Sequence, residues 1–322
     1  MNQPAPVAAP ELPPSTELTE VAKKIEGRSP WQLAFERLRH DKVAVACAVV
    51  ILLIILMAIL APVVASITGH GPNDQLRTGP GAGLSPAGIP IGPNSHFWLG
   101  ADNLGRDVLV RVFYGTRISL LAGVVASLVS VFVGVAIGLT AGFFGGWVDS
   151  ALSRFMDVVL SLPYLVFAIA LVAVVGPSLT VSIGVIAFFS FSSVGRIVRG
   201  QVLSVKEKEY VEAARSLGAS NLRIMFVDVL PNVLAPVIVY ATLLVPLSIV
   251  FEASLSFLGL GVVPPTASWG GMLSDSIQFY QVAWWFLVFP GLALLVTTLA
   301  FNLFGDSVRD AFDPSYNRLF NN

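Results

Sequence analysis

The chain has 322 residues, of which 55% are hydrophobic and only 12% are charged. An ordinary soluble domain carries about 25% charged residues, so this composition is typical of a protein that lies in lipid. The formal net charge of −1 gives no overall attraction to nucleic acid. A single cysteine, Cys47, excludes an internal disulfide and any metal site built from several cysteines.

The N-terminal 28 residues contain five prolines and four glutamates. They lack the basic start and short apolar core of a secretory signal, so we expect a disordered cytoplasmic tail. Ser29 can then cap a helix in which Trp31, Phe35 and Leu38 recur at helical spacing. This pattern predicts an interfacial helix on the cytoplasmic leaflet.

Windows without charged residues mark the membrane spans, because a charge at the bilayer centre costs about 2.5 to 3.5 kcal/mol. The windows are Val43–Ile67, Ile118–Val148, Val158–Gly195, Val229–Phe251 and Ser276–Gly305. The third window is too long for one helix, and Gly176-Pro177 near its middle predicts a tight hairpin of two spans. We therefore expect an all-α membrane protein with about six transmembrane helices.

The basic residues predict the orientation of these spans. With the N-terminus inside, 15 of the 19 Lys and Arg residues fall in cytoplasmic segments, a count that places Arg154, Arg196 and Arg199 in loops. This bias predicts a multi-pass protein of the bacterial cytoplasmic membrane with both termini in the cytoplasm. Trp284 and Trp285 are expected to anchor the start of the last span at the interface.

Two outer segments separate the first span from the second. Thr68–Pro93 is crowded with Gly and Pro and predicts an extended loop, either a solvated connector or a segment that contacts substrate. Gly105–Thr116 predicts a short surface helix with an Asp107–Arg111 pair.

The charged segment between the fourth and fifth spans has the pattern of two short helices. Lys208–Leu217 predicts the first, and Gly218 stands where a left-handed terminator belongs. Ser220 caps the second, which Pro231 is expected to close. Its apolar residues fall on one stripe, namely Leu222, Met225, Phe226 and Val229.

Three interpretations of this segment are possible. A DNA-reading motif is excluded, because there is no third helix to complete a core and both ends are tethered to spans. A docking element that presents its stripe to a groove on a partner is favoured. The alternative is a stripe that packs only on neighbouring spans.

The segment resembles the EAA motif of ABC importer permeases. Glu212-Ala213-Ala214, Gly218 and Leu230-Pro231 stand at that family's spacing, and Asp228 replaces the Ile of the general motif. Three further segments resemble dipeptide and oligopeptide permeases of the C type. They are Gly100–Asp107, similar to GTDxLGRD with Ala101 in place of Thr; Glu252–Gly261 with Pro264-Pro265 and Ser268-Trp269-Gly270; and Gly305-Asp306 with Arg309-Asp310 and Asp313-Pro314.

The resemblance implies type I ABC importer permease architecture and a five-part machine moving peptides by alternating access. Its other parts are a homologous second permease, two ATPase subunits and an extracytoplasmic solute-binding protein. The chain has no G-x-x-x-x-G-K-[ST] loop, so ATP and Mg are expected only in partner subunits, with no cofactor and no enzymatic activity here. The ATPase-coupling residues implied are Glu212, Ala213, Ala214, Gly218, Leu222, Met225, Phe226, Leu230 and Pro231; Glu212 and Gly218 shape the loop, and Leu222, Met225 and Phe226 form the docked face.

The chain accordingly divides into five parts. They are a tail over 1–28; the interfacial helix and first span over 29–68; an extracytoplasmic loop and short helix over 69–116; a permease core of five spans over 117–306 with the coupling loop at about 201–231; and a cytoplasmic tail over 307–322.

Other functions remain as alternatives. The same machine could carry nickel or another small solute, and a receptor or scaffold without transport is a further alternative. An ion-coupled carrier needs ionisable groups deep in the membrane, and Glu252 is the one candidate, expected to be hydrated near the outer end of its span. His40, His70 and His96 lack metal-ligand spacing and are expected to be solvated, so neither a metal site nor catalysis is predicted.

Overall fold

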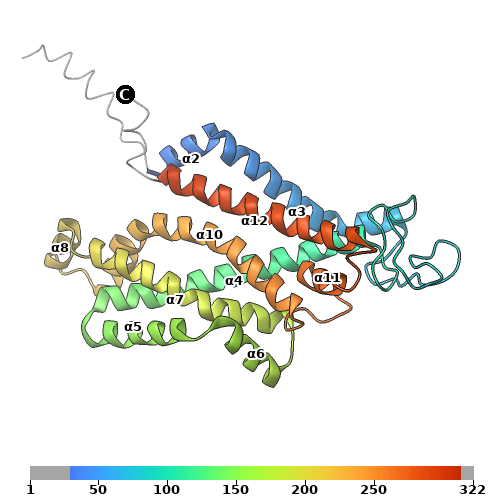
Figure 1. Cartoon of the computed structure of the whole chain (residues 1–322). Coiled ribbons are helices and arrows are strands. Elements are labelled where there is room, and N and C mark those ends of the chain that lie inside the picture. The colour runs from blue at the N-terminus through green and yellow to red at the C-terminus, as the bar shows by residue number, and fades with distance from the viewer. Residues whose placement is uncertain (1–29, 313–322) are drawn as a thin grey trace, which may run out of the picture.

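The computed structural model describes residues 30–312, which form α-helices, one π-helical segment and connecting loops (Figure 1). The predicted N-terminal tail, the Ser29 cap and Asp313-Pro314 lie outside the described residues. The long helices are α3 (Lys42–Thr68), α4 (Val108–Phe144), α7 (Leu179–Val205), α10 (Leu230–Phe257) and α12 (Trp284–Phe312). The shorter ones are α2 (Pro30–His40), α5 (Gly146–Ser161), α6 (Tyr164–Val175), α8 (Glu209–Ser216), α9 (Asn221–Arg223), the π-helix η1 (Ile224–Val229) and α11 (Trp269–Ser276).

The helices form an elongated bundle with two distinct ends (Figure 1). Helices α2, α3 and α12 lie along one side, α5 and α7 lie along the opposite side, and α4 and α10 run between them. Helix α8 projects at one end, which we call the α8 end. The long loop after α3 gathers near α11 at the other, which we call the loop end.

Within residues 30–312, five helices are long and apolar enough to cross a membrane, and α5 with α6 makes a sixth candidate if that bent pair is one span. The predicted break at Gly176-Pro177 is confirmed, since α6 ends at Val175 and α7 begins at Leu179. The straight span predicted from Val158 is wrong. Helix α5 begins at Gly146 and the chain turns by 86° before Tyr164, where Pro163 cannot donate a helical hydrogen bond.

The short surface helix predicted over Gly105–Thr116 is also wrong. Asp107 caps α4, accepting from the backbone N–H groups of Leu109 and Val110, and the helix then continues without a break to Phe144. The predicted Asp107–Arg111 ion pair does not form, because Arg111 reaches Asp102 instead.

Three further sequence assignments change in the structure. Arg154, Arg196 and Arg199 lie inside α5 and α7, not in loops. Trp285 is buried and its Nε1 donates to Ala101 O at 3.1 Å, so it holds the outer loop instead of anchoring the helix at an interface. At the C-terminal end, α12 continues to Phe312, beyond the start predicted for a tail at 307.

Helices α4 and α7 approach each other closely through glycines spaced four residues apart on α4. A Cβ at Gly134 would lie 2.5 Å from Val194 Cβ, and one at Gly142 would lie 2.8 Å from Val202 Cβ. Gly138 faces the backbone of Gly195 in the same seam. Small residues that let helix backbones approach are a common means of association between membrane helices. The seam therefore joins α4 and α7 into one rigid unit.

Candidate functional site

The segment between α7 and α10 forms the predicted pair of short helices. Helix α8 spans Glu209–Ser216, and Gly218 follows it with a φ of +80°, so the left-handed terminator is confirmed. The Ser220 side chain accepts a hydrogen bond from Arg223 N, which confirms the predicted cap. Both features depend on local chemistry, and both were correctly derived from the sequence.

The end of the second short helix differs from the prediction. Pro231 does not close it: α9 passes into the π-helix η1, which runs directly into α10 with Pro231 in the first turn. A π-helix carries i→i+5 hydrogen bonds, here from Leu230 N to Met225 O. The loop is therefore continuous with a long helix of the bundle.

The π-helix divides the predicted apolar stripe between two environments. Met225 and Val229 are buried, Met225 at 6% exposure, whereas Leu222 and Phe226 are exposed at 62% and 55%. A stripe at i, i+3, i+4 and i+7 assumes 3.6 residues per turn, and the wider π turn rotates successive side chains by less. The packing alternative therefore holds for Met225 and Val229, and only Leu222 and Phe226 of the stripe remain exposed.

The buried half of the loop packs on the rest of the bundle. Val211 of α8 and Ile224 of η1 join Val198 and Val202 of α7 in one apolar cluster. The cluster continues through Phe143 of α4 into α10. The loop is thus seated by apolar contacts on three long helices, α4, α7 and α10.

We call the buried residues of the loop that belong to this cluster the seat. The remaining predicted coupling residues lie outside the buried part of the cluster. Glu212, Ala213, Gly218 and Pro231 are exposed, and Ala214 and Leu230 are half-buried against the cluster. Leu217 is also an exposed apolar side chain of this loop, as are Leu222 and Phe226. We call these three side chains the docking face.

The loop end of the bundle holds a buried network of charges. Asp102 Oδ2 accepts from Arg106 Nε at 2.5 Å and lies 3.3 Å from Arg111 Nε, and all three side chains are buried. Arg106 also faces Asp275 of α11 at 3.5 Å. The motif Gly100–Asp107 therefore ties the outer loop to α4 and α11. Burial of the Asp275 carboxylate raises its pKa above the usual range.

Comparison with known proteins assigns the family. Residues 134–318 match the family described as "Binding-protein-dependent transport system inner membrane component", and residues 29–80 match the "N-terminal TM domain of oligopeptide transport permease C". The chain is 40% identical to the dipeptide transport system permease protein DppC of Alkalihalophilus pseudofirmus, over 94% of this chain and 93% of that protein. The chain belongs to the binding-protein-dependent transport permeases.

Other relatives of the permease carry related names. It is 45% identical to the oligopeptide transport system permease protein OppC of Escherichia coli K12, over 90% of this chain and 93% of that one. It is 39% identical to the glutathione transport system permease protein GsiD of Pectobacterium atrosepticum, over 89% and 92%. An inward-facing structure of the MetNI methionine ABC transporter aligns with a TM-score of 0.48 at 19% identity, covering 63% of this chain and 96% of that one.

These matches confirm two expectations drawn from the sequence. The resemblance to dipeptide and oligopeptide permeases is confirmed over most of the chain. The expected class, an all-α membrane protein of ABC importer permease type, is confirmed as well. The receptor, scaffold and ion-coupled carrier alternatives are set aside, since the family is a transport component that depends on a binding protein.

Two predictions about single residues of the permease are wrong. Glu252 is fully buried, not hydrated, and accepts hydrogen bonds from Ser119 of α4 at 2.9 Å and Ser256 at 2.7 Å. His70 is not a solvated histidine either: its Nδ1 lies 2.9 Å from Asp107 Oδ2 and its ring stacks on Phe97. The contacts of Glu252 with Ser119 and of His70 with Asp107 join distant parts of the chain, so no local sequence signal predicted them.

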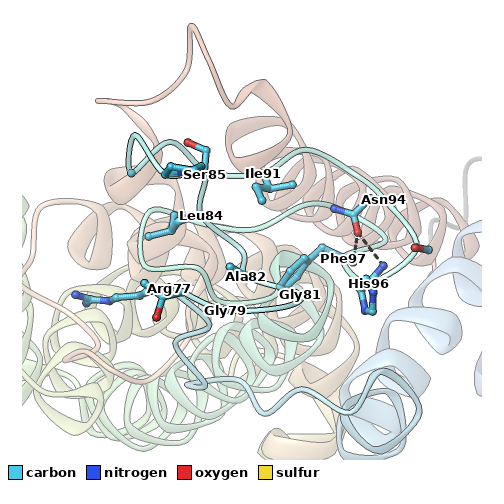
Figure 2. Close-up of a pocket in the computed structure, with 14 residues that line it drawn as sticks. Arg77, Gly79, Gly81, Ala82, Leu84, Ser85, Ile91, Asn94, His96 and Phe97 are labelled. Atoms are coloured by element: carbon cyan, nitrogen blue, oxygen red, sulfur yellow. Dashed lines mark hydrogen bonds between the residues drawn. The ribbon is translucent and has the colours of Figure 1, made fainter.

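The outer loop of the permease surrounds an open cavity of about 960 Å³ (Figure 2). Asn94 Oδ1 orders one wall by accepting from the backbone N–H groups of His96 and Phe97. Leu84 and Ile91 contribute apolar lining, and Arg77 lies on the opposite side of the view from His96. The loop thus has a defined fold although it forms no regular element.

Charged pairs inside the spans are the residues that sequence reasoning missed. Arg199 of α7 pairs with Asp149 of α5, with Nη2 to Oδ2 at 2.7 Å, and Arg196 Nη2 lies 2.5 Å from Asp157 Oδ1. The sequence contained a signal for these pairs. Asp149 and Asp157 are eight positions apart and Arg196 and Arg199 are three positions apart, and both spacings keep the two side chains on one face of their helix.

Proposed function

We propose that this permease is one of two membrane subunits of an ATP-driven, binding-protein-dependent importer of dipeptides and oligopeptides. The names of its DppC and OppC relatives support the substrate class. A homologous second permease, two ATPase subunits and an extracytoplasmic binding protein complete the machine. ATP and Mg bind in the ATPase subunits, and the peptide crosses by alternating access.

The observation that carries this proposal is the division of the loop between α7 and α10 into a seat and a docking face. Leu217, Leu222 and Phe226 expose apolar area beyond the end of the bundle. Exposed apolar side chains next to polar ones are typical of a surface that a protein partner covers. The partner is an ATPase subunit, whose groove accepts this face.

The proposed mechanism follows from the contacts of the seat. Val211 and Ile224 pack on α7, and the glycine seam joins α7 to α4. Movement of the docking face therefore displaces α4, α7 and α10 together as a rigid lever. Glu212 and Gly218 shape the loop, and Met225, being buried, acts in the seat and not in the docking face.

The orientation is part of the same proposal. Lys206, Lys208, Arg215 and Arg223 lie at the α8 end, and together with the 15 of 19 basic residues assigned above to cytoplasmic segments they favour the cytoplasmic side for this end. Both termini then lie in the cytoplasm, and the outer loop faces the binding protein.

Uptake into right-side-out proteoliposomes, with ATP inside and the binding protein outside, tests this function. A radiolabelled dipeptide should accumulate with ATP in the presence of a proton uncoupler, and Leu222→Asp should reduce accumulation at least tenfold because a carboxylate would enter an apolar groove. Asn221→Asp, an exposed neighbour with the same new charge, is the matched control and should retain uptake. Uptake that the uncoupler abolishes while ATP persists, or equal loss in both variants, would contradict the proposal.

A further inference from the structure

Two ion pairs join α5 to α7. Arg196 and Asp157 pair at 2.5 Å, with side chains 51% and 50% exposed. Arg199 and Asp149 form a second, less exposed pair nearer the α8 end. Exposed charges at an ordinary protein surface are unremarkable, so their meaning here depends on their depth in the membrane.

The pair of Asp157 and Arg196 belongs to a continuous polar surface. Exposed or half-buried polar and small residues recur every three or four positions on both helices, which places each set on one helical face. We call this surface the polar band; it comprises Ser150, Arg154, Asp157 and Ser161 of α5 and Ser193, Arg196, Gly200 and Ser204 of α7. The two helices lie side by side, so the band is one surface (Figure 1).

The band reaches deep into the hydrophobic region. Trp147, an exposed aromatic at the start of α5, and Lys206, at the end of α7, are residue types that mark a membrane interface. Asp157 and Arg196 each lie ten residues inside these markers, or about 15 Å at 1.5 Å per residue. The hydrocarbon core is about 30 Å thick, so the pair lies near its middle.

The polar band does not face lipid. A charged side chain at the bilayer centre costs about 2.5 to 3.5 kcal/mol or more, and such residues face bundle interiors or water-filled cavities. Helix α3 on the opposite side shows the alternative. Its exposed side chains between Val43 and Ile67 include Leu52, Leu53 and Ile59, and that stretch contains no charged residue.

We propose that the polar band lines the half of the solute passage nearer the α8 end, and that Asp157 and Arg196 contact the passing solute. This inference rests on the proposed function for the class of solute. A free peptide carries one ammonium and one carboxylate group, and the two side chains offer the opposite charge to each. Exchange of their mutual contact for contacts with the peptide keeps every charge paired along the path.

Cysteine accessibility tests the placement, because the chain has a single native cysteine. In a Cys47→Ala background, Ser161→Cys and Ser193→Cys introduce isosteric thiols into the band. Leu53→Cys, exposed on α3 at comparable depth, is the matched control. The complete transporter, purified with its co-expressed partner subunits and placed in proteoliposomes, is treated with a membrane-impermeant ammonium methanethiosulfonate.

Both band thiols should react at least tenfold faster than the control, since the reagent requires water and a thiolate. Reaction at the control rate would place the band in lipid or in a dry interface with the partner permease, and either result would overturn the proposal. This readout does not depend on what the solute is. Fast labelling without any peptide uptake would therefore support the water-accessible placement of the polar band and would contradict only the proposed substrate class.

A charge test addresses solute contact. Asp157→Asn and Arg196→Gln should each raise the KM for a free dipeptide severalfold more than the KM for a dipeptide with the matching terminus blocked. Ser150→Ala, a band residue without charge, should change neither KM. Equal changes for free and blocked peptides would show that the pair has a structural role only.

Discussion

The two ends of the permease are stabilised by different physical means. At the loop end, Asp102, Arg106 and Arg111 form a buried charge network that holds the outer loop to α4. At the α8 end, the loop is seated by apolar packing of Val211 and Ile224 on Val198 and Val202. Buried charges are satisfied only in one arrangement, whereas apolar packing is non-directional and does not require one fixed set of partners. The loop end is therefore held by contacts that allow one arrangement, and the α8 end is held by apolar packing.

The largest effect is expected from Asp102→Asn at the loop end. The substitution leaves the guanidinium groups of Arg106 and Arg111 buried without their shared carboxylate, and breaking a buried pair costs about 3 to 5 kcal/mol. Thermal unfolding in detergent should show a loss of more than 10 °C or failure to accumulate. Asp157→Asn removes the same charge from a half-exposed pair and should cost about 1 kcal/mol or less. Equal losses would remove the distinction between the two pairs.

The glycine seam gives the next largest effect. Gly134→Ala places a methyl group 2.5 Å from Val194 Cβ, and overpacking of this kind costs about 1 to 3 kcal/mol. Gly184→Ala in α7 meets nothing within 4 Å and should be neutral or slightly stabilising. The midpoints of thermal unfolding of the two variants measure this difference. Equal midpoints would show that the contact between α4 and α7 tolerates an added methyl group and is not the rigid contact that the proposed lever requires.

Gly218→Val tests the shape of the coupling loop. A side chain at a φ of +80° costs about 1 to 2 kcal/mol, and nothing lies within 4 Å of the new Cβ, so backbone strain is the whole effect. ATP-coupled uptake should fall severalfold while the unfolding midpoint changes little. Gly184→Val, at an open position with a negative φ, is the control. Wild-type uptake by the Gly218 variant would show that loop geometry does not set coupling.

The smallest effect is expected at Asp275. Burial raises the pKa of this carboxyl in the folded protein, so its contribution to stability is complete below its ordinary pKa of 3.8 and is lost as the pH rises through the folded value. At pH 7 Asp275→Asn should therefore be neutral or stabilising by less than about 1 kcal/mol, and the difference should vanish near pH 4. Unfolding midpoints at the two pH values measure this. A loss of stability at pH 7 would show that the contact with Arg106 outweighs burial.

The sequence predicted what depends on local chemistry and failed where partners are distant. Charge-free windows located the long helices, and Gly218 and Ser220 predicted the turn and the cap of the loop. Trp285 was misassigned because its partner, Ala101, lies 184 positions away. Glu252 was misassigned for the same reason, since Ser119 of α4 satisfies it.

Two other errors have local causes, and the sequence signals only the first of them. Pro163, inside the third charge-free window, ends α5 and permits the 86° bend, and a proline in a helical window predicts such a break. The burial of Met225 and the exposure of Phe226 depend on a π-helical turn, which the periodicity of an α-helix does not predict. The docking residues could thus be located from the sequence, but not divided between the seat and the exposed face.

Site-directed crosslinking at the docking face tests the central claim most directly. In a Cys47→Ala background, Phe226→Cys carries a photoactivatable thiol crosslinker in the assembled, transport-competent complex. The account predicts capture of an ATPase subunit at Phe226→Cys and at Leu222→Cys, with a yield that changes when ATP is bound. Capture is expected to fail at Leu53→Cys on α3. Absence of ATPase crosslinks from both loop positions in a complex that still transports would contradict the account.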